Sequence, residues 1–559
     1  MVTRIGTRLP ALIALVALLG FGMTAERAQA QAPTTASARA LHDSVGVNAA
    51  PHFLTGPYGD WNRALGMLRE LDVRHIRTAL LNSNNAGWNG AVYDLLRQTM
   101  RAGIRLNLAV PFNCSESGGM DRCLAALKTE LVPTGGVQSV EWPNEHDISG
   151  DANWVTTLRA WGQELYQKMK ADPALAPIPV IGPALVHPNS RSVLGDQSAY
   201  LDRGNLHPYT GAKSPAPDHM ASERMLASIV SRDEPLVATE VGFYTSFGRP
   251  GGDHPPADES SAAVYSLRTV LEHFASGVER TYFYELINPG TDQSNPEMNF
   301  GLLRHDYSPK PSFTALKNLL AMVGSSAPAS VTPLAHSVVG DTGDLRRIVL
   351  QQGDGTHLLV LWRTASVWNR DTRQPVVVAP QRYTVSVPGA SGYEAGDPML
   401  SSGFLPGRLD GDRIAVDVGA NPVILRIRSP GTAPPGTPGP QTGGPGSAPP
   451  GGSAAALDTR RPRLSRLRVK RVGRRYVAVF RLSEPARIGV RLDRGRAGSR
   501  TRYRFLRRLA VRTLRTGARS VTLGRKLKPG RHRVLLTATD AAGNEVRVAA
   551  RFRVPARRR

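Results

Sequence analysis

The sequence predicts an α/β protein. We expect a (β/α)8 barrel of the TIM type, then a small β-sandwich, a linker and a second, immunoglobulin-like or fibronectin-like β-sandwich. Three observations predict this order. Short β-branched runs alternate with helical patterns over residues 41–321, alternating strands without helices follow, and a proline- and glycine-rich tract precedes the last region. A chain of 559 residues is also longer than one hydrophobic core normally supports.

Residues 1–30 have the pattern of a secretory signal peptide. Arg4 and Arg8 precede an apolar run over residues 11–21, and the small-residue triplet AQA follows at 28–30. A membrane anchor is the alternative, but the run is about half of the ~20 apolar residues that a spanning helix needs. No later segment of the sequence is long enough to span a membrane. We therefore expect a secreted protein, with association with the cell envelope left open.

The barrel is expected over residues 31–325. Asp60 can cap a helix that carries Leu65 and Leu68 on one face, and similar helical patterns separate the expected strands. Eight strand-helix units in about 280 residues fit a closed barrel. An open doubly wound sheet is the alternative, but it normally has a glycine-rich turn after its first strand, and this sequence has none there. The expected strands are residues 44–48, 75–80, 104–110, 137–141, 178–183, 204–207, 235–240 and 280–285.

Three further regions follow the barrel. Residues 326–429 contain alternating runs such as RRIVLQQ and THLLVLWR, which predict an accessory β-sandwich. Residues 430–457 hold a Pro/Gly tract that cannot bury an apolar core, so we expect an extended, disordered linker. Residues 458–559 again contain alternating runs, such as YVAVFRLS and HRVLLTATD, and predict the second sandwich.

The positive charge of the chain, +25 in all, lies in its last region. Residues 458–559 hold 33 of the 70 basic residues but 5 of the 45 acidic ones, which leaves the rest of the chain slightly acidic. Arginine dominates, and its guanidinium group suits bidentate contacts with carboxylate or phosphate. An anionic cell-envelope polymer or acidic polysaccharide is therefore a candidate partner, and nucleic acid is less favoured. The alternative is a structural sandwich whose solvated face is arginine-rich through base composition alone.

Cys114 and Cys123 are the only cysteines in the sequence. In an oxidising compartment they can pair across the polar loop CSESGGMDRC, and two free, buried thiols are the alternative. Two cysteines and scattered histidines lack the spacing of a metal site, so we expect no metal ion.

Two carboxylates stand where a barrel enzyme has its active site, at the carboxyl ends of the strands. Glu145 follows the fourth expected strand in VEWPNEHD, and Glu240 ends the seventh in PLVATEVGF. Glycoside cleavage needs two carboxyl groups, one to protonate the departing oxygen and one to attack the sugar carbon or activate water. The pair therefore predicts a glycosidase. This chemistry needs no cofactor, and the implied substrate is an oligosaccharide or polysaccharide.

The order of these motifs resembles clan A of the glycoside hydrolases, most closely families five and thirty-nine. An Asn-Glu pair ends the fourth strand, His207 and Tyr209 form an HxY motif after the sixth, and a Thr-Glu pair ends the seventh. The resemblance implies that Glu145 is the general acid/base and Glu240 the nucleophile of a retaining double displacement. It covers residues 41–325 and includes the closing stretch GLLRHDYSPKPSFTALKNLL, where a Lys-Pro pair starts the last helix.

The resemblance also implies supporting roles. Asn144 would hydrogen-bond the sugar 2-hydroxyl, Tyr209 would support the nucleophile, His207 would line the site, and Arg77 would keep the nucleophile ionised. The sequence departs from the family pattern in two places. Glu145 is followed by histidine and not by the commoner proline, and the eighth strand ends in Tyr284-Glu285 instead of a tryptophan. The identity of the sugar therefore stays open.

Each of these residues also has an ordinary structural interpretation. The glutamates can cap turns, Arg77 can serve a structural ion pair, and His207 and Tyr209 can be core residues. Four aromatic residues are candidates for stacking on a sugar, although packing explains each nearly as well; they are Trp88, Trp142, Tyr244 and Tyr284. Glu141 and Glu285 are left unassigned. Two alternative functions also remain: a non-catalytic carbohydrate-binding or adhesion protein, and a transglycosylase.

Overall fold

The computed structural model of the chain forms two compact units, residues 1–439 and 440–559, which are described separately. The predicted signal peptide (1–30) and linker (430–457) lie outside the described residues. The structure describes residues 35–112, 114, 119–247, 255–428, 463–472, 475–483, 486–495, 503–514, 517–524, 527–539 and 545–555.

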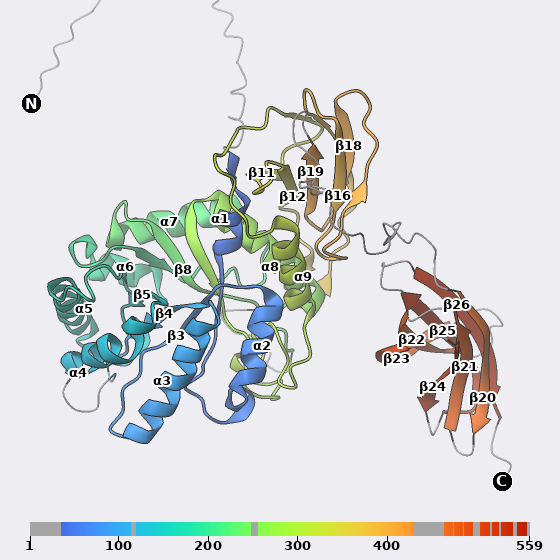
Figure 1. Cartoon of the computed structure of the whole chain (residues 1–559), viewed down its shortest axis with the longest axis horizontal. Coiled ribbons are helices and arrows are strands. Elements are labelled where there is room, and N and C mark those ends of the chain that lie inside the picture. Colours follow the sequence, from blue (N-terminus) through green and yellow to red (C-terminus); the bar gives the residue numbers. More distant parts are fainter. Residues whose placement is uncertain are drawn as a thin grey trace, which may run out of the picture. The chain divides into compact units, whose positions relative to one another are not determined.

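The predicted barrel is confirmed. Eight parallel strands form one sheet in the order β6-β5-β4-β3-β2-β9-β8-β7; β3, β4, β5 and β8 are labelled in Figure 1. A parallel bridge between Ile181 and Arg203 joins the two outer strands β6 and β7, and the Gly182 amide donates to the Arg203 carbonyl at 2.8 Å. The sheet therefore closes on itself, and the open doubly wound alternative is wrong. The strands are β2 (Val45–Asn48), β3 (His75–Ala79), β4 (Arg105–Ala109), β5 (Val137–Glu141), β6 (Val180–Ile181), β7 (Gly204–Leu206), β8 (Leu236–Val241) and β9 (Val278–Phe283).

Helices cover the outside of the barrel and begin at capping residues that the chain supplies locally. The Asp60 carboxylate accepts a hydrogen bond from the Arg63 amide at 3.1 Å, as expected for the start of α2, and Asp258 caps α8 through the Ser261 amide at 2.7 Å. The helices are α2 (Trp61–Leu71), α3 (Ala86–Arg101), α4 (Gly119–Ala126), α5 (Trp154–Ala171), α6 (Pro188–Leu194), α7 (Pro217–Ser231), α8 (Glu259–Ala275) and α9 (Pro311–Val323).

The structure pairs Cys114 with Cys123 in a disulfide, with the two Cα atoms 6.1 Å apart. Both cysteines are buried, at 4% and 0% exposure, so the pair lies in the core. The sequence between them is polar and had suggested a surface loop. The bond ties the segment after β4 to α4.

The accessory sandwich follows the barrel and packs two antiparallel layers around its own core. One sheet has the order β1-β11-β12-β19-β16-β17 and the other β10-β15-β18. Its edge strand β1 (Thr35–Ser37) comes from before the barrel and pairs in parallel with β11, so the expected barrel boundary at residue 31 is wrong for this segment. The other strands are β10 (Ser337–Val339), β11 (Leu345–Gln351), β12 (His357–Arg363), β15 (Gln381–Ser386), β16 (Gly392–Gly396), β17 (Leu405–Pro406), β18 (Arg413–Val418) and β19 (Val423–Arg428).

Buried polar contacts bind the accessory sandwich to α8 of the barrel. Arg268 is fully buried, and its guanidinium donates to the carbonyls of Ala365 and Ala420, each at 2.6 Å. The Glu272 carboxylate accepts from the Trp362 indole at 2.7 Å. A buried charged group is costly unless it is paired, so these contacts hold the two domains in one arrangement.

The predicted C-terminal sandwich is confirmed, and it has seven described strands. Its sheets have the orders β20-β21-β24 and β23-β22-β25-β26. The arginine-rich runs RLRVKRV and YRFLRRLAVRTL lie in β20 and β23. The strands are β20 (Leu464–Val472), β21 (Arg475–Leu482), β22 (Ala486–Gly495), β23 (Tyr503–Leu514), β24 (Gly517–Gly524), β25 (Gly530–Thr539) and β26 (Glu545–Val554). Among all described residues, no helix is long and apolar enough to cross a membrane.

Candidate active site

The predicted site residues come from the ends of four strands of the barrel. Arg77 lies on β3, Glu145 follows β5, His207 and Tyr209 follow β7, and Glu240 lies on β8. The carboxyl ends of parallel strands meet at one end of a barrel, which brings these distant residues together.

Glu145 and Glu240 converge on His207. His207 Nδ1 lies 2.7 Å from Glu145 Oε1 and 3.8 Å from Glu240 Oε2, and one oxygen of each carboxylate lies within 4.8 Å of the other. His207 Nε2 lies 3.0 Å from the Thr239 hydroxyl, which fixes the ring. The side chain of Glu145 is 23% exposed and that of Glu240 is 11% exposed, so both carboxylates remain accessible from the barrel end.

The guanidinium group of Arg77 uses all five of its N–H donors. Nε and Nη2 bind the two oxygens of Glu141 at 2.8 Å each, and Nη2 also donates to Asn144 Oδ1 at 2.6 Å. Nη1 donates to Asn48 Oδ1 at 3.0 Å and to Glu240 Oε1 at 2.5 Å. Burial alone would lower the pKa of Arg77, but the charges of Glu141 and Glu240 raise it above its ordinary value. Arg77 therefore holds a permanent positive charge against Glu240.

Glu240 is held in its ionised form by three neighbours. Burial alone would raise the pKa of this carboxyl, but the charges of His207 and Arg77 and the hydroxyl of Tyr209 together lower it below the ordinary value. Tyr209 donates to Glu240 Oε2 at 2.9 Å. The pKa of Tyr209 is raised by burial and by the charge of Glu240, so the phenol stays protonated and remains a donor.

Glu141, which the sequence analysis did not assign, anchors Arg77 beneath the site. It is fully buried, and each of its oxygens is satisfied beyond the ion pair with Arg77. Asn107 donates to Oε2 at 2.8 Å, while Asn205 and the Thr239 hydroxyl donate to Oε1 at 3.1 Å each. The alternation of side chains along the strand, which puts Glu141 inside the barrel, was the signal for this role.

The backbone at Glu145 adopts a left-handed conformation, with φ 45° and ψ 45°. This region is unfavourable for residues other than glycine, and such strain concentrates at functional sites. The turn carries the Glu145 side chain to His207. Its neighbour Asn144 is exposed and uses its carbonyl oxygen for Arg77, while its amide nitrogen has no partner among the described residues.

Glu285 lies just after β9, next to the same site. It is 6% exposed, its Oε2 accepts from the Tyr58 hydroxyl at 3.2 Å, and its Oε1 has no partner among the described residues. Burial, together with the negative charges of Glu297 and Glu240, raises the pKa of Glu285 to about 8, against the lowering effects of Tyr58 and Lys310. Glu285 is therefore a neutral acid at pH 7, with one oxygen available for another hydrogen bond.

The stacking role considered for Trp142 is wrong. Its ring is fully buried against α5, and a Cβ atom at Gly162 would stand 1.9 Å from it, so no sugar can reach its face. Tyr244 is also buried, at 3% exposure. Tyr284 is half-buried, and its hydroxyl donates to Glu297 at 3.3 Å, while Trp88 is half-buried on α3. For Tyr284 and Trp88, both sugar stacking and ordinary packing therefore stay open.

Glu145, His207 and Glu240 could also hold a metal ion, which the sequence spacing did not predict. One ligand atom of each lies within 4.8 Å of the others. Arg77 already places a fixed positive charge 2.5 Å from Glu240, and a divalent cation beside it would be repelled. The arrangement therefore suits proton transfer and nucleophilic attack better than metal binding.

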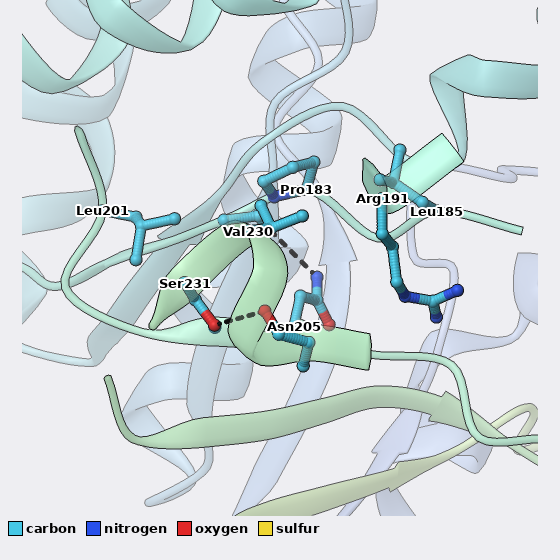
Figure 2. A pocket seen from close by; sticks show the side chains of 10 residues that line it. Pro183, Leu185, Arg191, Leu201, Asn205, Val230 and Ser231 are labelled. Atoms are coloured by element: carbon cyan, nitrogen blue, oxygen red, sulfur yellow. Dashed lines mark hydrogen bonds between the residues drawn. The ribbon is translucent and has the colours of Figure 1, made fainter. Parts of the chain in front are cut away.

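Two cavities lie elsewhere in the barrel domain. Figure 2 shows one at the junction of β6 and β7, where Asn205 donates to the Gly182 carbonyl and Ser231 to the Ala227 carbonyl, each at 3.1 Å. Its volume of about 10 Å³ has room for about one water molecule, so it is a packing gap. The other, of about 420 Å³, is polar and lies among the loops after β8 and β9. There the buried Lys310 donates to Asn288 and to the Asn299 carbonyl, and burial lowers the pKa of Lys310 to about 7.

Neither family models nor curated protein sequences match this chain. Solved structures similar to it include a family 39 glycoside hydrolase from Bacteroides cellulosilyticus WH2, at 16% identity and TM-score 0.49, over 71% of this chain and 83% of that one. A glucosidase from Croceicoccus marinus has 14% identity and TM-score 0.47, over 71% and 96%. A bacterial orthologue of human α-L-iduronidase has 12% identity and TM-score 0.43, over 91% and 97%. Sequence identities and TM-scores this low do not indicate a function. The proposed function therefore depends on the geometry of the site.

Proposed function

We propose that the protein is a secreted, retaining glycoside hydrolase that cleaves O-glycosidic bonds by double displacement. The observation that carries the proposal is the approach of the Glu145 and Glu240 carboxylates, whose nearest oxygens lie within 4.8 Å at the carboxyl ends of the strands. Retaining glycosidases hold their two carboxyl groups about 5–5.5 Å apart, whereas inverting enzymes need ~6.5–9.5 Å to admit a water molecule.

Glu240 has the properties of the nucleophile. A nucleophilic carboxylate must be ionised, and Arg77 and Tyr209 bind one oxygen each while lowering the pKa of Glu240. These two contacts also fix the plane of the carboxylate, so that it need not reorient when the substrate arrives.

Glu145 has the position of the general acid/base. The Glu145 side chain is more exposed than that of Glu240. Its carboxylate contacts His207 Nδ1, and this contact orients the carboxylate. In the first step a Glu240 oxygen bonds to the anomeric carbon, the glycosidic bond breaks, and the leaving oxygen takes the Glu145 proton. In the second step water gives a proton to Glu145 and attacks the same carbon, which releases Glu240.

Neighbouring groups suit the binding of the sugar. The unpartnered amide nitrogen of Asn144 can donate to the 2-hydroxyl, as the resemblance implies. The protonated Glu285, whose Oε1 has no partner among the described residues, offers a second polar contact near Glu240.

The roles of the two glutamates are tested by azide rescue of E145A and E240A on an activated aryl glycoside. Both variants should lose turnover by orders of magnitude, because each lacks one partner of the displacement. Azide should then restore product from both. E145A should give a glycosyl azide with the configuration of the substrate, and E240A the opposite configuration, as read by proton NMR.

Glu164 supplies the matched control, since it lies on the outside of α5 with 47% of its side chain exposed. E164Q should keep wild-type turnover, and so should the wild-type protein in EDTA. Full activity of E240A on a panel of chromogenic glycosides would overturn the assignment. A folded wild-type protein that binds oligosaccharides but cleaves none of the panel would instead support the non-catalytic alternative.

Secretion and the partner of the C-terminal unit complete the proposal. The signal-like residues 1–30 and the Cys114–Cys123 disulfide both support an oxidising, extracytoplasmic compartment. The charge of residues 458–559 supports an anionic polymer as a partner.

A further inference from the structure

One face of the C-terminal sandwich carries a regular set of arginines. In the sheet β23-β22-β25-β26, alternate residues such as Leu492, Val534 and Leu536 are buried in the core. Because successive side chains point to opposite faces of a strand, the residues between them face outward. We call this outward set the arginine face; its described members are Arg491, Arg531, Arg533, Arg551 and Arg553. The strands that carry it, β22, β25 and β26, are labelled in Figure 1.

The register of the strands places arginines directly opposite each other. Arg533 pairs with Arg551, and Arg531 pairs with Arg553. Opposite side chains lie ~5 Å apart, and like charges at that distance destabilise a sheet. Arg551 and Arg553 are exposed and form no hydrogen bond or ion pair with another described residue. The charges of Arg551 and Arg553 are therefore an electrostatic cost that an external anion can relieve.

Asp493 is the counterion within the arginine face. It is fully buried, and its oxygens accept from Arg491 Nε at 2.8 Å and from Arg533 Nη2 at 2.7 Å. This carboxylate fixes the guanidinium groups of Arg491 and Arg533 on the surface. Fixed donors bind with a smaller loss of side-chain entropy than free ones, which favours ligand binding over random surface charge.

We propose that the arginine face binds a linear acidic polysaccharide that carries carboxylate or sulfate groups along its chain. Guanidinium groups bind both kinds of oxyanion bidentately. Rows of arginine ~5 Å apart across the strands and ~7 Å apart along them let one extended polymer make several contacts at once. The choice of a sugar polymer rests on the proposed function of the barrel.

Single-stranded nucleic acid fits the arginine face less well. Its binding sites combine basic grooves with aromatic rings on which bases stack. The outward residues described on β22, β25 and β26 include leucine, alanine, threonine and arginine, and none of them is aromatic. Phe552 stacks on the buried His532 in the core.

The test measures binding of the full-length E240A protein to polygalacturonate, chondroitin sulfate, neutral dextran and single-stranded DNA at several salt concentrations. The arginine-face variant is R551S/R553S. The matched control is R468S/R481S, which removes the same charge from exposed positions on β20 and β21 of the other sheet. We expect R551S/R553S to weaken binding to at least one acidic polysaccharide by about tenfold, and the control by less than about twofold.

Polygalacturonate carries carboxylates alone, whereas chondroitin sulfate carries both carboxylates and sulfates, so tighter binding to chondroitin sulfate would indicate a contribution from sulfate. Equal losses from both variants would mean binding by net charge alone and would overturn the proposal, as would tighter binding to DNA or binding that does not weaken with salt. Turnover of aryl glycosides by the wild-type protein measures the activity of the barrel in the absence of any polymer. A failure of the proposed glycosidase activity can therefore be distinguished from a failure of polymer binding. Thermal unfolding of R551S/R553S should match the parent or exceed it, which shows that the sheet is intact.

Discussion

Arg77 divides the barrel end into two regions that use the same residue type differently. Beneath it, Glu141 is fully buried, and both of its oxygens are satisfied by Arg77 and three further donors. Beside it, Glu240 accepts from Arg77 and Tyr209 and keeps an exposed edge toward Glu145. A glutamate in this barrel is thus structural when its hydrogen bonds are complete, and reactive when one side is left open.

The comparison predicts opposite phenotypes for two isosteric variants. E240Q should lower kcat by about 10⁴-fold or more, or about 5.5 kcal/mol in the barrier, because the nucleophile is lost. E141Q should lower the free energy of unfolding by about 3 kcal/mol or more, because it breaks a buried ion pair. E240Q should cost less stability than E141Q, since Arg77 keeps Glu141 as its counterion. Urea unfolding measures the stability of the two variants, and turnover of an aryl glycoside measures their activity. Equal losses of stability in E240Q and E141Q would contradict the distinction between a reactive and a structural glutamate.

Tyr209 tests whether the open side of the site is electrostatically tuned. Y209F removes one hydrogen bond to the Glu240 carboxylate, worth about 1.5–3 kcal/mol for a charged acceptor, so kcat should fall by roughly tenfold to a hundredfold. The pKa of Glu240 should rise in the variant. The acidic limb of the pH profile of kcat/KM should therefore move to higher pH. A fall in kcat with an unmoved acidic limb would assign Tyr209 to packing alone.

Glu285 is tested through the pH dependence of the free energy of unfolding. The pKa of Glu285 is about 8 in the folded protein and near 4.5 in the unfolded chain, so the unfolded state loses this proton first as pH rises. Stability should fall between about pH 4.5 and pH 8, at up to about 1.4 kcal/mol per pH unit, and level off above. E285Q should abolish this fall, and urea unfolding at pH 5, 6, 7 and 8 measures it. The exposed E70Q variant is the control, and parallel curves for E285Q and wild type would contradict the pKa.

Much of the site follows from the sequence because strand ends can be located by pattern. The strand carrying Glu141 was predicted with the bounds that the structure has, and the position of Glu145 after it follows. Trp142 illustrates what pattern reading missed. It follows Glu141, which points inward, so alternation turns Trp142 toward the helices, where Gly162 leaves space for its ring.

Other features depend on partners remote in the chain. The five contacts of Arg77 go to residues at the ends of three other strands, β2, β5 and β8, and no local pattern encodes their distances. Strands β20 and β23 were missed because arginine occupies most of their polar positions and obscures the alternation. Strand β1 is three residues long, and its partner β11 lies beyond the whole barrel.

The pairing of β1 with β11 has a consequence for synthesis of the chain. Residues 35–37 leave the ribosome before any barrel strand, and their partners 349–351 emerge only after the last barrel helix. The accessory sheet can therefore gain its edge only if this early segment stays unengaged while the whole barrel is translated.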